Sequence, residues 1–507
     1  MSDVTTHREI EYKLRVHALF RLPELAGTCA GAAAIEPLPT FTMRNTYYDT
    51  ADLKLFRWRV TLRKREGGPD EGWHLKLPVD ARPGVRDELQ VPLTSGAVPE
   101  ELRSIIRALI RTAPLGPVVT LVSERSPLLL RNAAGIITAE LVDDTVSVLD
   151  GERAAAVFRE IEVEGVPDAE GCIEESTLIS VVNSLVAAGA VPGTASKAAA
   201  ALGPRTSSPC DVPDAHWPDL HEPAGEAVRA YLATHVRRLL LEDVRLRRGL
   251  PDAVHQLRVA ARRIRSGLQV FAPLLDSDFA DELRTELSWA AGSLGIARDT
   301  EVLVDRLTDH CQHLSAIHAG LIIDKSIPTL DRELADETTL ALERMNSPRY
   351  ITLLETLVQA ATDPPLTPLA EKSAKQVLPP LTTRAMRRLR RDVRSLRLTD
   401  PAATWHSTRI AAKQARYAVE CVAPVLGHDY TRLAQRLSAA TDILGAHQDA
   451  HVAQHTLERL AQQADGPTGY ALGLLHAVEV DAERQDREKF MRKIWPRVRR
   501  AAKRTGS

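Results

Sequence analysis

The sequence predicts an α+β protein of two large parts, a β-rich amino-terminal half and an all-helical carboxy-terminal half. At 507 residues the chain is too long for one hydrophobic core, because domains hold roughly 100–200 residues. Up to about residue 200, short β-patterned runs alternate with turn signals such as Glu66-Gly67-Gly68-Pro69. From Ala224 onward, segments rich in Ala, Leu and Arg place apolar residues at a spacing near 3.6, which is typical of helices.

The order of these patterns sets the domain boundaries. We place a β-rich domain at residues 5–203, with one helical insertion near Pro99 to Thr112, and a helical domain at residues 224–500. Residues 204–223, rich in Pro, Ser, Asp and His, are expected to form the linker.

The helical half contains an internal repeat. Glu242-Asp243-Val244-Arg245 and the later His255-Gln256-Leu257-Arg258 recur as Arg391-Asp392-Val393-Arg394 and His406-Ser407-Thr408-Arg409. Two copies of one helical unit, at about 224–370 and 371–500, explain this recurrence.

Composition excludes several classes of protein. The formal net charge of -2 argues against a globally basic nucleic-acid binder, so any polyanion site must be local. The five cysteines form no CxxC pair, which argues against a disulfide framework or a thiolate metal site. Without an apolar signal segment or a long apolar run, we expect a cytoplasmic protein without membrane contact.

The first strand alternates charged and apolar residues. Glu9, Glu11 and Lys13 share one face, and Ile10 and Tyr12 share the other. A solvated outer face is the ordinary interpretation of one such strand. The pattern recurs, however, in four later segments, which carry Arg59, Arg63 and Arg65; His74 and Lys76; Glu140 and Asp144, with Asp143 on the other face; and Glu160, Glu162 and Glu164.

This recurrence favours an ionic ligand site. Three carboxylates within five residues of one strand face, Glu160 to Glu164, repel each other unless cations offset them. Oxygen ligands without patterned His or Cys favour Mg²⁺ or Mn²⁺. The accompanying Arg and Lys are suited to phosphate oxygens. We therefore expect a site for a metal-bound triphosphate, the alternative being ion pairs in the wall that contact no ligand.

These residues resemble the CYTH, or triphosphate tunnel metalloenzyme, family. Glu9-Ile10-Glu11-Tyr12-Lys13 is similar to its ExExK motif. Further blocks follow in family order: Thr46-Tyr47-Tyr48-Asp49-Thr50, Leu62-Arg63-Lys64-Arg65, Leu75-Lys76, Glu160-Ile161-Glu162-Val163-Glu164 and Ser196-Lys197. The resemblance implies an antiparallel β-tunnel. One departure is Arg59, where members often have glycine.

The resemblance also implies roles for individual residues. The metals would be held by Glu9, Glu11, Asp144, Glu162 and Glu164, and the phosphates by Lys13, Arg63, Arg65, Lys76, Arg125 and Lys197. The catalytic group would comprise Glu9, Glu11, Lys13, Glu162 and Glu164, with Glu140, Glu160 and Arg86 as additions.

The helical half carries one basic stripe in each repeat. The stripes are His255, Arg258, Arg262 and Arg265, and His406, Arg409, Lys413 and Arg416, with the same spacing. Each covers about 15 Å of helix, since the rise is about 1.5 Å per residue. One stripe is ordinarily a solvated face, but two copies favour an anion site. Further arginines expected to border the groove are Arg237, Arg238, Arg245 and Arg247 in the first copy and Arg384, Arg387, Arg388, Arg391 and Arg394 in the second.

These blocks, with Leu294-Gly295-Ile296-Ala297-Arg298-Asp299, resemble the CHAD family. In the second copy, Gln448 replaces the arginine of the corresponding block. The resemblance implies two pseudo-symmetric helical bundles with a basic channel for inorganic polyphosphate. Histidine in the stripes would add charge only below about pH 6.5.

The function we expect is metal-dependent hydrolysis of inorganic triphosphate in the tunnel, with long-chain polyphosphate bound by the helical domain. Two alternatives stay open: a non-catalytic protein that binds polyphosphate granules, and an adenylate cyclase of the same tunnel family. The preferred triphosphate and the oligomeric state stay open too, and no specific nucleic acid partner is expected.

Overall fold

The computed structural model describes residues 5–79, 85–93, 96–168, 172–193 and 196–506, and at 293, 294 and 296–298 the backbone alone. The chain divides into two compact units, Met1–Asp211 and Val212–Ser507, which we call the barrel unit and the helical unit. The division falls inside the segment expected to be a linker.

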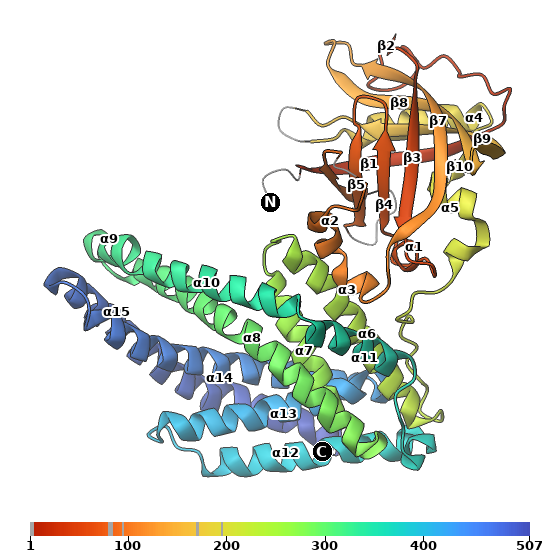
Figure 1. Ribbon diagram of the computed structural model, residues 1–507. Coiled ribbons are helices and arrows are strands. Elements are labelled where there is room, and N and C mark those ends of the chain that lie inside the picture. Colours follow the sequence, from red (N-terminus) through yellow and green to blue (C-terminus); the bar gives the residue numbers. More distant parts are fainter. Residues whose placement is uncertain (1–4, 80–84, 94–95, 169–171, 194–195, 507) are drawn as a thin grey trace. The chain divides into compact units, whose positions relative to one another are not determined.

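The barrel unit is built on one antiparallel sheet that closes on itself (Figure 1). The strands pair in the order β1-β6-β5-β4-β3-β7-β8-β9, and β9 pairs again with β1, which confirms the predicted barrel. Outside this ring, β2 pairs with β7 and β10 with β1. The strands are β1 (Thr5–Val16), β2 (Ala34–Pro37), β3 (Phe41–Asp49), β4 (Thr61–Glu66), β5 (Gly72–Pro78), β6 (Val85–Val91), β7 (Gly116–Arg131), β8 (Ile137–Asp150), β9 (Arg153–Gly165) and β10 (Val191–Gly193).

The alternating pattern puts the apolar face outward in part of the barrel. Leu14, Leu141 and Val163 are fully buried in a core that they share with Leu178 and Val181 of helix α4 (Glu175–Ala187). The charged residues between them on the same strands therefore point into the barrel. The remaining helices of this unit are α1 (Lys54–Arg57), α2 (Glu100–Ile105), α3 (Arg107–Ile110), α5 (Lys197–Leu202) and the 3₁₀ turn η1 (Gly203–Ser207).

Arg59 does not belong to the charged strand face on which the sequence pattern put it. Strand β4 begins at Thr61, and Arg59 lies in the preceding turn with φ 58°. Its N–H donates to Phe56 O at 2.9 Å. This left-handed conformation explains why glycine suits the position, since a Cβ is unfavourable there.

The helical unit confirms the predicted all-helical half. Its α-helices are α6 (Ala224–Arg247), α7 (Ala253–Val270), α8 (Ser277–His310), α9 (Ala316–Lys325), α10 (Ile327–Met345), α11 (Pro348–Thr362), α12 (Ala374–Ser395), α13 (Ala402–Leu426), α14 (His428–Ala461), α15 (Gly466–Lys489) and α16 (Trp495–Arg504). Shorter turns are η2 (Ala272–Leu274), η3 (Cys311–His313), η4 (Pro368–Glu371) and the π-helical η5 (Phe490–Ile494).

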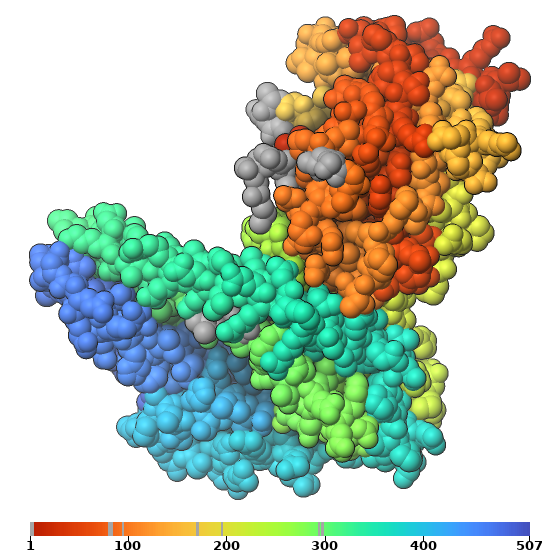
Figure 2. Space-filling model, viewed as in Figure 1, coloured from red at the N-terminus to blue at the C-terminus, as the bar shows by residue number. Residues whose placement is uncertain are grey.

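The repeat in the sequence recurs in the helices. The series α6, α7, α8 is followed by the corresponding α12, α13, α14, and both α8 and α14 span 34 residues. Helix α7 packs against α13, so the two stripe-bearing helices are neighbours. Figure 2 shows the helices of the first repeat, in green and teal, and those of the second, in blue, with a hollow between them. Among the described helices, none is long and apolar enough to cross a membrane.

Candidate functional site

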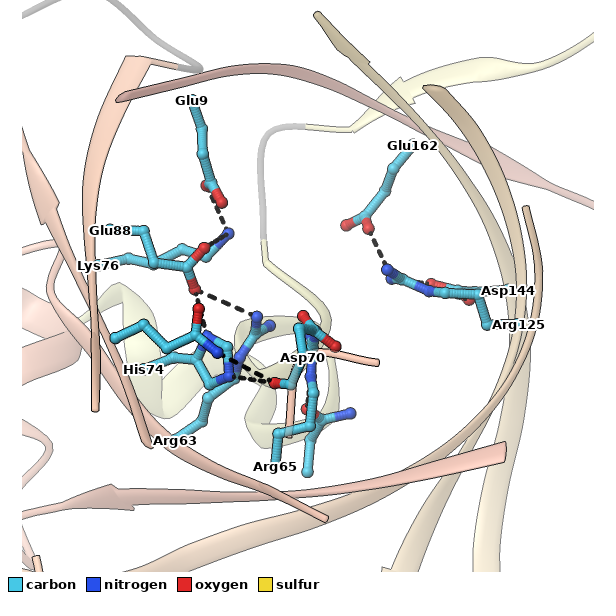
Figure 3. Close-up of polar contacts among 12 residues, drawn as sticks. Glu9, Arg63, Arg65, Asp70, His74, Lys76, Glu88, Arg125, Asp144 and Glu162 are labelled. Atoms are coloured by element: carbon cyan, nitrogen blue, oxygen red, sulfur yellow. Dashed lines mark hydrogen bonds and ion pairs between the residues drawn. The ribbon is translucent and has the colours of Figure 1, made fainter. Parts of the chain in front are cut away.

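Charged side chains from opposite walls of the barrel point into the space that the strands enclose (Figure 3). On one wall lie Glu9, Lys76 and Glu88, and on the other Glu162 and Arg125. A cavity of about 90 Å³ runs between them. It is lined by Glu9, Glu11, Lys13, Tyr47, Thr61, Arg63, Arg65, Asp70, Lys76, Arg86, Glu88, Arg125, Glu162, Glu164, Ser196 and Lys197.

Glu162, on β9, is the centre of one group of ion pairs. Its Oε1 lies 2.6 Å from Lys13 Nζ, and its Oε2 lies 2.7 Å from Lys197 Nζ and 3.2 Å from Arg125 Nη2. Lys13 also lies 3.0 Å from Glu11. Burial opposes ionisation of Glu162, but the three cations hold its pKa well below the usual value. This carboxylate is therefore charged and fixed in orientation.

Glu88, on β6, is the centre of a second group. Its Oε1 accepts from His74 Nδ1 at 2.9 Å and from Arg63 Nη2 at 3.3 Å, and its Oε2 lies 3.6 Å from Lys76 Nζ. Lys76 in turn lies 2.5 Å from Glu9. His74 is fully buried, and burial lowers its pKa to about 4.

Two of the predicted metal ligands are desolvated carboxyl groups with little compensation. Burial raises the pKa of Glu9 to about 9, against the opposing effect of Lys76. Burial and the neighbouring carboxylates Glu11 and Glu162 raise the pKa of Glu164 to about 7. The acids thus exceed what the surrounding bases neutralise at this end of the cavity, and an added cation would favour their ionised forms.

Most of the predicted tunnel residues come together, but three do not line the cavity. Asp144 lies behind Arg125, bonded to its Nη2 at 2.8 Å, and 2.6 Å from Lys197. Glu140 and Glu160 are also absent from the lining. Both oxygens of Glu160 are buried without a hydrogen-bond partner in the described structure. Asp144 is placed to orient Arg125 and Lys197, and direct metal contact stays a prediction for it.

Sequence reasoning missed Glu88, Asp70 and His74 as members of one network. For Glu88 a signal was present, because Arg86, Glu88 and Gln90 alternate with buried Leu89 and Val91 in the same way as on the other strands. Asp70 lies in the turn between β4 and β5, where no periodicity applies.

The helical unit contains a larger cavity, of about 1750 Å³. Its basic lining residues are Arg262, Arg265, Arg284, Arg384, Arg387, Arg388, Arg391, Arg409 and Lys413. Among the described lining residues, Asp392 is the one acid. The Nε groups of Arg262 and Arg409 are buried and have no hydrogen-bond partner in the described structure. An anion in this cavity would supply the missing acceptors.

The structure divides the two predicted stripes. Their central members, Arg262, Arg265, Arg409 and Lys413, line the cavity. The other members do not line it: His255, Arg258, His406 and Arg416.

Three of those four have protein partners that the structure shows. Arg258 lies 3.4 Å from Asp299, His406 Nδ1 lies 2.7 Å from Gln448 Oε1, and Arg416 Nε donates to Glu420 at 2.7 Å. In the first copy's Leu-Gly block, the side chains of Leu294 and Arg298 lie outside the described residues.

A closed antiparallel sheet with an ionic interior, joined to paired helical repeats around a basic cavity, defines a two-part β-tunnel and helical-bundle protein. The chain belongs to the CYTH–CHAD family: residues 7–175 match the CYTH domain and residues 230–458 match the CHAD domain. It is 32% identical to an uncharacterized protein of Mycobacterium tuberculosis strain CDC 1551 over 526 residues, 98% of each chain.

Two solved structures resemble parts of the chain. PptA from Streptomyces chartreusis is 30% identical, with a TM-score of 0.46, over 54% of this chain and 99% of that one. The CHAD domain of the plant Ricinus communis is 24% identical, with a TM-score of 0.44, over 58% of this chain and 95% of that one.

Proposed function

We propose that the barrel unit hydrolyses inorganic triphosphate with Mg²⁺ or Mn²⁺, and that the helical unit binds long-chain polyphosphate. The observation that carries the first part is the cavity lining. Four carboxylates, Glu9, Glu11, Glu162 and Glu164, share one cavity with six bases, which are Lys13, Arg63, Arg65, Lys76, Arg125 and Lys197.

The bases account for binding. A triphosphate carries about four negative charges near neutral pH, so its hydrolysis needs neutralisation and positioning more than a covalent nucleophile. Arg63 and Arg125 come from opposite walls, and each is already oriented by a carboxylate, Glu88 for the first and Asp144 for the second. Guanidinium groups held in this way can donate to phosphate oxygens without losing their orientation.

The acids fit a hard divalent metal. All four donors are carboxylate oxygens, the ligand type that Mg²⁺ and Mn²⁺ prefer. Burial disfavours the charged forms of Glu9 and Glu164, whose pKa values are raised to about 9 and about 7. In the described residues, no group of three or more such side chains is already arranged around a shared metal position. When bound, the metal would polarise phosphate oxygens and lower the pKa of a coordinated water.

Glu162→Gln tests the proposed catalysis. The wild-type protein with Mg²⁺ or Mn²⁺ should release phosphate from tripolyphosphate, and the variant should lose at least about 100-fold in rate. Glu124→Gln, an exposed change beside Arg125 on β7, is the matched control and should retain activity. Absence of phosphate release by the wild type would overturn the proposal, and cyclic AMP formed from ATP would identify a cyclase instead.

The large basic cavity supports polyphosphate binding by the helical unit. Nine cations face one acid in the described lining, so their mutual repulsion is relieved when an extended polyanion enters. We expect binding of long-chain polyphosphate that weakens steeply with salt. Arg262→Ala with Arg409→Ala should abolish it, and Glu162→Gln should leave it intact. Loss of polyphosphate binding in the barrel variant alone would contradict this division of roles.

A further inference from the structure

The turn between β4 and β5 places an acid on one of the proposed phosphate-binding arginines. The Asp70 carboxylate pairs with Arg65 Nη1 and lies among the side chains in the cavity (Figure 3). Its main-chain carbonyl accepts from His74 Nε2 at 2.9 Å and from Gln90 Nε2 at 3.4 Å. The turn is thus tied to β5 and β6, which holds the carboxylate in place.

Arg65 is a guanidinium that needs an anion. Its side chain is 4% exposed, and burial together with the like charges of Arg63 and Arg125 lowers its pKa to about 9. Its Nε donates to Asn45 Oδ1 at 3.0 Å, and within the described structure Asp70 is the carboxylate at ion-pair distance. The Asp70 side chain itself is 42% exposed, so it approaches Arg65 from the open side.

We propose that Asp70 occupies the position of a substrate phosphate on Arg65, and that its displacement selects terminal over internal phosphate groups. This inference rests on the proposed function, because it concerns which end of a triphosphate the barrel accepts.

The selection follows from charge. The Asp70 carboxylate carries one negative charge, a terminal phosphate about 1.5 to 2 near neutral pH, and an internal phosphate one. Exchanging Asp70 for a terminal group therefore strengthens the Coulomb interaction with Arg65, while exchanging it for an internal group gains nothing. The cost of displacing Asp70 then falls mainly on ligands without chain ends.

Asp70→Asn tests the proposal with two probes, tripolyphosphate and cyclic trimetaphosphate, whose phosphates are all internal. Binding to the full chain is measured by calorimetry in EDTA, so that no turnover occurs. We expect trimetaphosphate to bind about fivefold more tightly to the variant than to the wild type, with a smaller change for tripolyphosphate. Glu71→Gln, the neighbouring acid that bonds to Gly67 N, is the matched control and should change neither.

The ratio of the two affinities decides the outcome. An unchanged ratio, or weaker binding of both probes to Asp70→Asn, overturns the inference even if the wild type hydrolyses tripolyphosphate. The effect should also disappear in an Arg65→Gln background, because it acts through that guanidinium. If circular dichroism shows that Asp70→Asn does not fold, Asp70→Ser removes the same charge and is measured in its place.

Discussion

Lys413 should make polyphosphate binding depend on pH in a range where histidine does not titrate. Burial, followed by the like charges of Arg409 and Arg262, lowers the pKa of Lys413 to about 7, while Asp449 opposes this. The side chain lines the basic cavity, so in the unliganded protein it is largely neutral above about pH 7. Polyphosphate would return its pKa toward the ordinary 10.5 of lysine.

The sign follows from proton linkage. Since the bound state holds a proton that the free state has lost, binding takes up a proton between the two pKa values, and affinity falls as pH rises. Between about pH 7 and about pH 8.5 the expected loss is about tenfold, which corresponds to about 1.4 kcal/mol. Below about pH 7 Lys413 is charged in both states, and its contribution becomes constant.

Lys413→Arg is the matched variant, because arginine stays charged throughout this range. Affinity for long-chain polyphosphate is measured at constant ionic strength for the variant and the wild type. The wild type should show the tenfold loss, and the variant should bind with nearly the same affinity at both pH values. Equal pH dependence in the two proteins would refute the assignment to Lys413.

Three further predictions concern stability and binding. Arg59→Gly should stabilise the protein by up to about 1 kcal/mol in urea unfolding, because it relieves a left-handed backbone, whereas Arg59→Ala should not. Asp243→Asn should cost about 3 kcal/mol in the same assay, since it leaves Arg247 buried without its carboxylate partner at 2.6 Å; no loss would contradict this. Arg409→Ala should weaken polyphosphate binding about tenfold and Arg416→Ala by less than about threefold, because Arg416 is already paired with Glu420; equal losses would contradict this.

The sequence could predict the barrel interior because its strands break the usual relation between charge and exposure. Period two shows only that Glu9 and Glu11 share a face, and an isolated strand would put that face in water. Recurrence on several strands, with both signs of charge, indicated that the faces meet. The pairing of β1 with β9 then brings Lys13 opposite Glu162 in the ladder, and their side chains form the 2.6 Å ion pair.

Residues outside a periodic segment could not be found in this way. Asp70 reaches the cavity through the geometry of a turn, and Asp144 is withdrawn from it because Arg125 and Lys197 cover it. Strand parity assigns Asp144 to the inner face correctly, but it does not say which inner residue lies next to the cavity and which lies behind another side chain. That depends on side-chain length and partner, which only the folded barrel fixes.

The two helical repeats share a backbone arrangement but not a charge arrangement. In the aligned blocks, Arg391 of the second copy takes the place of Glu242 in the first. Arg391 lines the basic cavity, whereas Glu242 lies 3.3 Å from Arg245, and neither of these two lines it. Because duplication conserves helix packing more readily than surface charge, the repeat predicted two equivalent stripes where the structure has one-sided recruitment of α12. The proposed polyphosphate contacts therefore fall mainly on the second repeat, with α7 contributing Arg262 and Arg265 from across the cavity.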